Sequence, residues 1–187
     1  MTDTFRTSKL VSSIDPSKPH IVLVGLPGAG KSTVGALLGA RLQRTFLDFD
    51  LEIERREGMP VAQIFGERGE AGFRQLERAI TEELRAFGNM VLAPGGGWVS
   101  DPATVAVIRP PAIMVYLSAR PEAALQRLGG GHGGRPLLSG PDPLSEIKSL
   151  LDSRRLAYQA ADIEVGTELL TPQQVTDKII AKLSLQA

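Results

Sequence analysis

Residues 25–33 combine the residue types and the spacing needed to bind a nucleoside triphosphate. They match the pattern G-x-x-x-x-G-K-[ST] at every fixed position. Glycines let backbone N–H groups converge on an anion, and the helix expected next points its positive end at the same place. Lys31 supplies a charge for the β- and γ-phosphates, and Ser32 supplies a hydroxyl for Mg²⁺. A chance glycine-rich turn is disfavoured, because an apolar strand pattern precedes the segment and a helical pattern follows it.

Two carboxylates follow the second predicted strand. Asp48 and Asp50 are two residues apart, so they share one side if the chain is extended there. Phosphoryl-transfer sites usually use a carboxylate at the end of a strand to organise Mg²⁺. The alternative is that Asp50 only caps the next helix. The sequence leaves both possibilities open.

A run of three glycines, Gly95, Gly96 and Gly97, follows the third predicted strand. Ligands of open α/β sheets bind at the carboxyl ends of strands, and three glycines let a small ligand lie against backbone N–H groups. The alternative is a flexible turn. Trp98, the next residue, either lines a pocket or fills the core.

Three arginines on predicted helices differ in their expected roles. Arg74 lies three residues before Glu77, which is the usual setting of a surface ion pair of little energetic value. Arg154 and Arg155 are adjacent on another helix, and at least one of them is expected to be a solvated charge.

Residues 129–141 include six glycines among thirteen residues, a composition that no buried segment tolerates. We therefore predict a mobile lid. Arg135 is the cation of this segment and is placed to close over phosphates. His132 is expected to be exposed and without a role.

Apolar segments alternate with helical patterns, which predicts a parallel sheet flanked by helices. The predicted strands are 21–24, 45–48, 90–93, 113–117 and 162–165. The predicted helices are 34–42, 51–58, 60–65, 70–87, a short one from 101, 121–128, 144–158 and 171–183.

Composition narrows the class of protein. The 187 residues suffice for one α/β domain, and the formal net charge of zero does not indicate a nucleic-acid or anionic-membrane binder. The absence of cysteine excludes disulfides and cysteine metal sites and suits a cytosolic protein. We expect a flexible extension over residues 1–19 and a single domain over residues 20–187.

Together these segments resemble the shikimate kinases, from Ile21 to the last helix. The pieces occur in that family's order: the loop 25–33, the Asp-x-Asp of Asp48 and Asp50, Gly72-Phe73-Arg74 with Glu77, the triple glycine, Arg135-Pro136-Leu137-Leu138, and Arg154 four residues before Tyr158. Pro94 and Trp98 depart from the common pattern, and Trp98 would narrow or reshape the acceptor pocket if it lined it.

The resemblance implies an α/β P-loop fold of the nucleoside-monophosphate-kinase type, with a five-stranded parallel sheet in the order 2-3-1-4-5. It implies that ATP phosphorylates the 3-hydroxyl of shikimate with Mg²⁺ as cofactor, in aromatic amino-acid biosynthesis. The expected partners are ATP and shikimate, without nucleic acid or membrane. The expected enzyme is a cytoplasmic monomer.

The resemblance also implies site residues. ATP would be bound by Gly28, Ala29, Gly30, Lys31, Ser32, Thr33, Arg127, Arg135 and Pro172. Shikimate would be bound by Asp50, Arg74, Gly95, Gly96, Gly97 and Arg154. Mg²⁺ would be bound by Ser32 and, through water, by Asp48. Lys31, Asp50 and Arg135 would be the catalytic residues.

Two other functions compete with this hypothesis. A gluconate kinase of the same fold would bind ATP, but its acceptor would not need Arg74 and Arg154 together. A ligand sensor related to the kinases would have no need of every catalytic group. A GTPase switch is disfavoured, because no Asp-x-x-Gly occurs and the sole asparagine, Asn89, precedes methionine.

Overall fold

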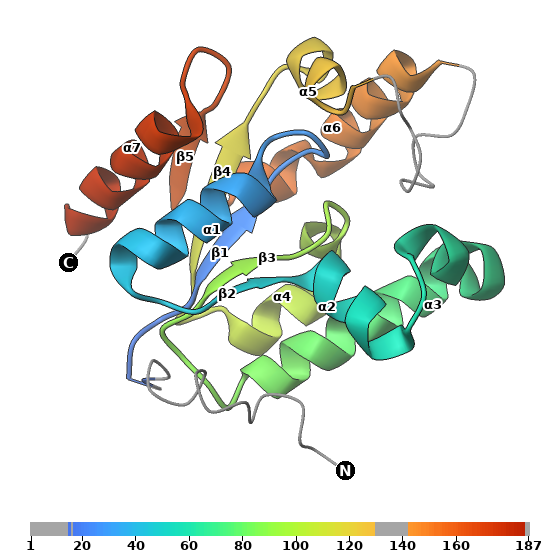
Figure 1. Ribbon diagram of the computed structural model, residues 1–187, viewed down its shortest axis with the longest axis horizontal. Coiled ribbons are helices and arrows are strands. Elements are labelled where there is room, and N and C mark those ends of the chain that lie inside the picture. The colour runs from blue at the N-terminus through green and yellow to red at the C-terminus, as the bar shows by residue number, and fades with distance from the viewer. Residues whose placement is uncertain (1–14, 16, 130–141, 186–187) are drawn as a thin grey trace.

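The computed structural model describes residues 15, 17–129 and 142–185 of the chain (Figure 1). Five parallel strands form one sheet in the order β2-β3-β1-β4-β5. This order confirms the predicted one. The strands are β1 (Ile21–Val24), β2 (Phe46–Asp48), β3 (Val91–Ala93), β4 (Ile113–Ser118) and β5 (Ile163–Gly166).

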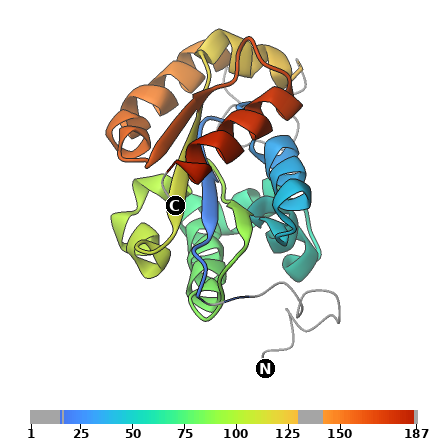
Figure 2. The same ribbon diagram turned by 90° about the vertical axis from the view of Figure 1, so that its left-hand side faces the viewer.

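Helices cover both faces of the sheet. They are α1 (Lys31–Leu42), α2 (Phe49–Glu57), α3 (Val61–Leu84), the short 3₁₀ helix η1 (Trp98–Ser100), α4 (Pro102–Ile108), α5 (Pro121–Arg127), α6 (Pro143–Gln159) and α7 (Pro172–Ser184). Figure 2 shows α1 and α7 on one side of the strands and α4 and α6 on the other. β1 is central and every residue of it is buried, as expected for a strand covered on both faces.

The sheet order decides where the functional segments meet. β1 lies between β3 and β4, and β2 lies beyond β3. The loops after β1, β2 and β3 leave the same edge, because the carboxyl ends of parallel strands lie together. The phosphate-binding loop, the Asp48 segment and the triple glycine are therefore neighbours in space.

Helix α2 begins earlier than predicted, at Phe49, because Asp48 is its N-cap. The Asp48 carboxylate accepts hydrogen bonds from the N–H groups of Asp50 (3.0 Å) and Leu51 (3.4 Å). The alternative that Asp50 caps the helix is therefore wrong. The Asp50 side chain is left to face the site.

The predicted helices 60–65 and 70–87 join into α3, with a kink at Gly69. Gly69 has φ = 65°, a backbone conformation that favours glycine. The second part of α3 carries Arg74 and Glu77 towards the triple glycine. The helix ends at Leu84, three residues before the predicted end.

Residues at the amino end of the described domain are attached to the sheet. The Lys18 carbonyl accepts a hydrogen bond from the Asn89 N–H (2.9 Å), and the Pro19 carbonyl accepts one from Arg44 (2.8 Å). Most of the predicted extension lies outside the described residues. No helix in the described part of the chain is both long and apolar enough to cross a membrane.

Candidate active site

The loop between β1 and α1 forms a backbone cradle. Gly28 has φ = 81°, and a Cβ atom there would lie 2.2 Å from the Ala124 carbonyl oxygen, so only glycine fits. The Lys31 ammonium donates hydrogen bonds to the carbonyls of Gly25 (2.9 Å) and Leu26 (3.2 Å). The lysine therefore lies over its own loop, at the place where an anion would meet the N-terminus of α1.

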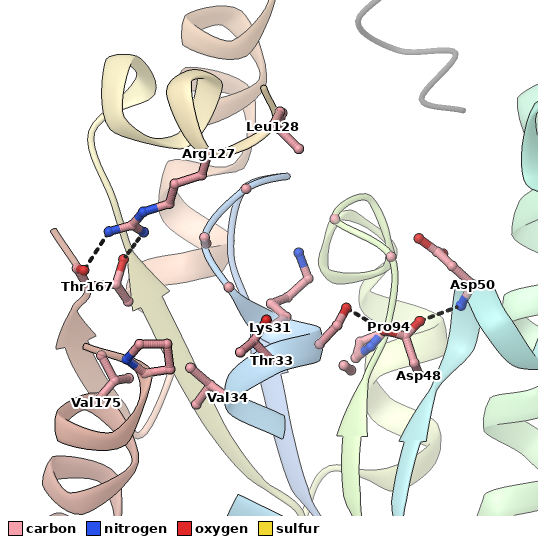
Figure 3. Close-up of a pocket in the computed structure, with 18 of the residues that line it drawn as sticks. Lys31, Thr33, Val34, Asp48, Asp50, Pro94, Arg127, Leu128, Thr167 and Val175 are labelled. Carbon is pink, nitrogen blue, oxygen red and sulfur yellow. Dashed lines mark hydrogen bonds between the residues drawn. The ribbon is translucent and has the colours of Figure 1, made fainter. Parts of the chain in front are cut away.

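A cavity of about 420 Å³ opens beside this loop. It brings together most of the residues predicted from the sequence: Gly28, Ala29, Gly30, Lys31, Ser32, Thr33, Asp48, Asp50, Gly95, Gly96, Arg127 and Pro172. Figure 3 shows Arg127 and Asp48 on opposite sides of Lys31. The cavity thus extends from the α5 end of the sheet to the segment that follows β3.

Ser32 and Asp48 both line the cavity and contact each other. The Ser32 hydroxyl donates to Asp48 Oδ2 at 2.5 Å. A hydroxyl and a carboxylate are oxygen ligands of the kind that Mg²⁺ prefers. The described residues contain no cluster of three or more His, Asp or Glu side chains that would bind a metal unaided. This donor set fits an ion that takes further ligands from phosphates and water.

Each residue of the triple glycine faces a charged side chain. A Cβ atom on Gly95 would lie 2.6 Å from Glu77 Oε1 and 3.2 Å from Asp50 Oδ1. On Gly96 it would lie 3.1 Å from Arg154 Nη1. On Gly97 it would lie 2.1 Å from Arg74 Nη2, so any side chain there displaces the arginine. Two carboxylates and two guanidinium groups therefore converge on three residues.

Arg154 is buried, although its neighbour Arg155 is exposed and paired with Asp152. Arg154 is 6% exposed, and its Nη1 has no hydrogen-bond partner among residues 15, 17–129 and 142–185. Tyr158, one turn later on α6, donates to the Gly96 carbonyl at 3.3 Å. The tyrosine thereby attaches this face of α6 to the triple glycine. Of the two adjacent arginines, Arg154 is therefore the one that faces the triple glycine.

Arg74 and Glu77 form a pair in which Glu77 is buried and Arg74 half-buried, which corrects the expectation of a weak surface pair. Glu77 is 1% exposed, and its carboxylate accepts from Arg74 and from the Gly95 N–H (3.0 Å). Burial raises the pKa of Glu77, and the nearby Asp50 carboxylate adds to this effect, whereas Arg74 opposes it. Removing one partner would leave the other charge buried without compensation, so either substitution is expected to destabilise the fold.

Trp98 is buried, with 2% of its surface exposed, and it does not line the cavity. The structure therefore favours the alternative in which Trp98 fills the core. An acceptor pocket narrowed by its indole ring is not observed. Arg135 and His132, with most of the predicted lid, lie outside the described residues.

A family model described as shikimate kinase matches residues 27–184. The chain belongs to the shikimate kinase family. The match includes residues 27–33 of the phosphate-binding loop, Arg74, Arg154 and the last helix, so it covers nearly all of the segments from which the described site is built.

Individual shikimate kinases are similar over most of their length. The enzyme of Symbiobacterium thermophilum is 42% identical over 166 residues, which are 88% of this chain and 95% of that protein. The structure of a shikimate kinase from Acinetobacter baumannii in complex with shikimate superposes with a TM-score of 0.86 and 35% identity, over 91% of this chain and 96% of that one.

The competing gluconate kinase function has a structural relative that is more distant from this chain. A gluconokinase from Sinorhizobium meliloti superposes with a TM-score of 0.60 and 18% identity, over 90% of this chain and 93% of that one. At that identity the likeness shows the shared fold alone. The much higher identity to shikimate kinases is what separates the two families for this chain.

The sequence did not indicate Thr167 as part of this shikimate kinase site. Arg127 donates to Thr167 Oγ1 (2.8 Å) and to the Thr167 carbonyl (2.6 Å), as Figure 3 shows. Thr167 is 3% exposed and directly follows β5. The signal that could have identified Thr167 is its position at the carboxyl end of a strand, where ligands of open α/β sheets bind. The contact fixes the Arg127 guanidinium on the cavity wall.

Proposed function

We propose that this chain transfers the γ-phosphoryl group of ATP to the 3-hydroxyl of shikimate, giving ADP and shikimate 3-phosphate. The observation that carries the proposal is the cavity beside Lys31, which ends at a triple glycine surrounded by Asp50, Arg74 and Arg154. The cavity lining reaches Gly95 and Gly96 but does not include Gly97, Arg74 or Arg154, so the charged seat for a small acid lies next to the phosphate cradle, at the far side of the glycines.

The acceptor side suits a small carboxylic acid with hydroxyl groups. Arg154 brings a buried nitrogen without a hydrogen-bond partner in the described chain, and such a group is costly unless an anion meets it. Arg74 adds a second guanidinium at Gly97. Guanidinium groups bind carboxylates in forked geometry. We assign the shikimate carboxylate to these two arginines and the ring to the N–H groups of Gly96 and Gly97.

Asp50 is the proposed catalytic base. Its carboxylate lines the cavity and lies beside Gly95, the residue before the two glycines that contact the acceptor arginines. From there it accepts a hydrogen bond from a ring hydroxyl and takes its proton as the hydroxyl attacks the γ-phosphorus. A carboxylate is suited to this role because phosphoryl transfer needs orientation and charge stabilisation more than covalent chemistry.

Lys31 is the proposed cation for the transferring group. Its ammonium lies at the loop carbonyls of Gly25 and Leu26, and a triphosphate in the cradle would compete for the same donor. Charge that develops on the phosphoryl oxygens is then stabilised by a group already in place. We also assign Arg135 to the phosphates, on the family resemblance alone, because it lies outside the described residues.

We propose Mg²⁺ as the cofactor, bound by the Ser32 hydroxyl directly and by Asp48 through water. The facing oxygens of these two residues support this assignment. The ion, when bound, neutralises charge on the β- and γ-phosphates. Asp48 also caps α2, so it fixes the start of the helix that carries Asp50.

The adenine side is assigned to Arg127 and Pro172. Both line the cavity at the end opposite Asp48, together with Leu128, Leu170 and Val175. A guanidinium fixed by Thr167 offers a flat, charged face against which an aromatic base stacks. We further propose that the enzyme is a cytoplasmic monomer, with size-exclusion chromatography and cell fractionation as the checks.

A coupled ADP-release assay tests the proposed reaction. Purified full-length chain is given ATP and Mg²⁺ with shikimate, quinate or gluconate. We expect turnover of shikimate at least about 100-fold above the other two, because quinate and gluconate carry the same carboxylate but place their hydroxyl groups differently, which leaves hydrogen-bonding groups of the site unpaired. Turnover of gluconate alone would assign the gluconate kinase function. ATP and shikimate binding without turnover would assign the sensor.

A further inference from the structure

The triple glycine is attached to helix α3 at both of its ends. At its start, the Gly95 N–H donates to Glu77 Oε1 at 3.0 Å. Just beyond its end, the Trp98 indole N–H donates to the Thr81 hydroxyl at 3.0 Å. Glu77 and Thr81 are four residues apart, so they lie on one face of α3. The second attachment uses two residues that have no part in the chemistry described above.

The four residues form a closed hydrogen-bonded ring. The Thr81 hydroxyl accepts from Trp98 and donates to the Glu77 carbonyl at 2.8 Å. The Trp98 backbone N–H donates to the Gly95 carbonyl at 3.0 Å, which closes the ring. Thr81 is fully buried and Trp98 nearly so. Hydrogen bonds in such surroundings are strong, and an unpaired member is costly.

The ring lies next to the contact between Gly97 and the acceptor arginine Arg74. Arg74 lies on the same face of α3, one turn before Glu77. Its guanidinium packs directly against Gly97, where a Cβ atom would lie 2.4 Å from Arg74 Cζ. Trp98 follows Gly97 in the chain. The position of the indole anchor therefore sets the distance between Gly97 and Arg74.

We propose that Thr81 and Trp98 are positioning residues for the acceptor site. Three consecutive glycines have more conformational freedom than any other tripeptide, so their geometry must come from what flanks them. The indole–hydroxyl bond keeps Gly96 and Gly97 at the spacing that Arg74 requires, and so sets the affinity for the acceptor acid without touching it. This inference rests on the proposed function, since it names what organises the same site.

The test compares Thr81→Val with Thr81→Ser. Valine has the shape of threonine but leaves the Trp98 N–H unpaired, whereas serine keeps the hydroxyl. We expect Thr81→Val to raise the shikimate KM about ten-fold and to leave the ATP KM within two-fold, because one buried hydrogen bond is lost on the acceptor side only. Thr81→Ser should restore the shikimate KM to within two-fold of the parent.

Thr176→Val is the matched control. Thr176 is also buried in a helix, and its hydroxyl also donates to the carbonyl four residues earlier, that of Pro172, at 2.9 Å. It lies on α7, away from the triple glycine. We expect it to lower the unfolding midpoint as Thr81→Val does, while the shikimate KM stays unchanged. A purely structural role for Thr81 predicts the same kinetic result for both variants, which would overturn the proposal.

A double-mutant cycle with Trp98→Phe completes the test. Removing both partners leaves no unpaired group, so the double variant should raise the shikimate KM less than the sum of the single effects in log units. Strict additivity would contradict the proposed coupling. Calorimetric titration with shikimate gives the same comparison without turnover. If the parent protein fails to turn over shikimate, the proposed function falls; if the parent is active and Thr81→Val keeps its shikimate affinity, only this inference falls.

Discussion

The nucleotide side and the acceptor side of this site are built in different ways. On the nucleotide side, the loop between β1 and α1 presents backbone groups, and its one catalytic side chain, Lys31, belongs to the same nine-residue segment. On the acceptor side, Arg74 from α3 and Arg154 from α6 converge on glycines that follow β3. The phosphate-binding part of the nucleotide side is therefore local in sequence, whereas the acceptor side is assembled across the fold.

This difference indicates which substitutions should impair each half of the site. A backbone cradle depends on a few φ angles and tolerates change elsewhere in the chain. An assembly of charged side chains depends on buried partners such as Glu77, since a charge left without its partner is destabilising. Substitutions should therefore separate the two substrates cleanly, and the following predictions test that separation from the largest effect to the smallest.

Lys31→Met should have the largest effect, because it removes the cation of the cradle. We expect kcat to fall about 1,000-fold or more, since charge stabilisation at the transferring group is lost. The unfolding midpoint should stay within a few degrees of the parent value. ADP release and thermal melts measure both. A loss below ten-fold would mean that the cradle works through its backbone alone.

Asp50→Asn removes the proposed base from the boundary between the two halves. We expect kcat to fall about 100- to 1,000-fold while the ATP dissociation constant changes less than two-fold. Single-turnover kinetics and nucleotide titration measure the two quantities. A large loss of ATP affinity would instead place Asp50 in the nucleotide half.

Arg154→Met probes the acceptor half with its own control, Arg155→Met. Arg154 is buried at Gly96, whereas Arg155 is exposed and paired with Asp152. We expect the first change to raise the shikimate dissociation constant about 100-fold, because a charge-assisted pair is lost, and the second to raise it less than two-fold. Equal effects of both substitutions would contradict the assignment of the carboxylate site.

Thr167→Val probes the far end of the nucleotide half. The Arg127 guanidinium loses its bond to the hydroxyl but keeps its bond to the Thr167 carbonyl. We expect the ATP KM to rise about five-fold, the value of one net hydrogen bond, with no change in the shikimate KM. A change in the shikimate KM of equal size would show that the two halves are coupled through β5.

His20 lies at the opposite end of β1 and should affect stability alone. The Met90 N–H donates to its Nδ1 (3.3 Å), so Nε2 carries the proton and donates to the Leu84 carbonyl (3.2 Å). Burial lowers the pKa of His20 below its usual 6.5. The unfolded chain thus binds more protons below pH 6.5, and stability is lost as pH falls from 6.5 through the lower folded-state pKa.

His20→Asn should remove this acid sensitivity, because its amide oxygen accepts from Met90 without titrating. Thermal melts between pH 5 and 7.5 should show a midpoint that falls a few degrees more in the parent than in the variant. Parallel curves would rule out the histidine as the cause. The KM values for ATP and shikimate should not change, so this substitution is a control that alters stability without altering either half of the site.

Most of the fold was predictable, because strands and helices leave local patterns of apolar residues. Each strand lies within one residue of its predicted bounds, and α7 starts at its predicted capping box. The strand order agrees with the one implied by the family resemblance. The misses lie where a side chain decides a boundary. Asp48, not Asp50, caps α2, and the sequence analysis considered only Asp50 for that role. The join of two predicted helices at Gly69 depended on packing that no local pattern records.

The sequence by itself determined the phosphate-binding loop and the parallel sheet flanked by helices, because both follow from contiguous residues and from the alternation of strands and helices. The sheet order was implied by the resemblance to the shikimate kinases. The tertiary structure alone decided that Arg154 is buried and Arg155 solvated, that Glu77 joins Arg74 to Gly95, and that Trp98 bonds to Thr81. These facts depend on which helix face meets the loop after β3. A contact between residues 17 or more positions apart in the sequence is fixed only when the core packs.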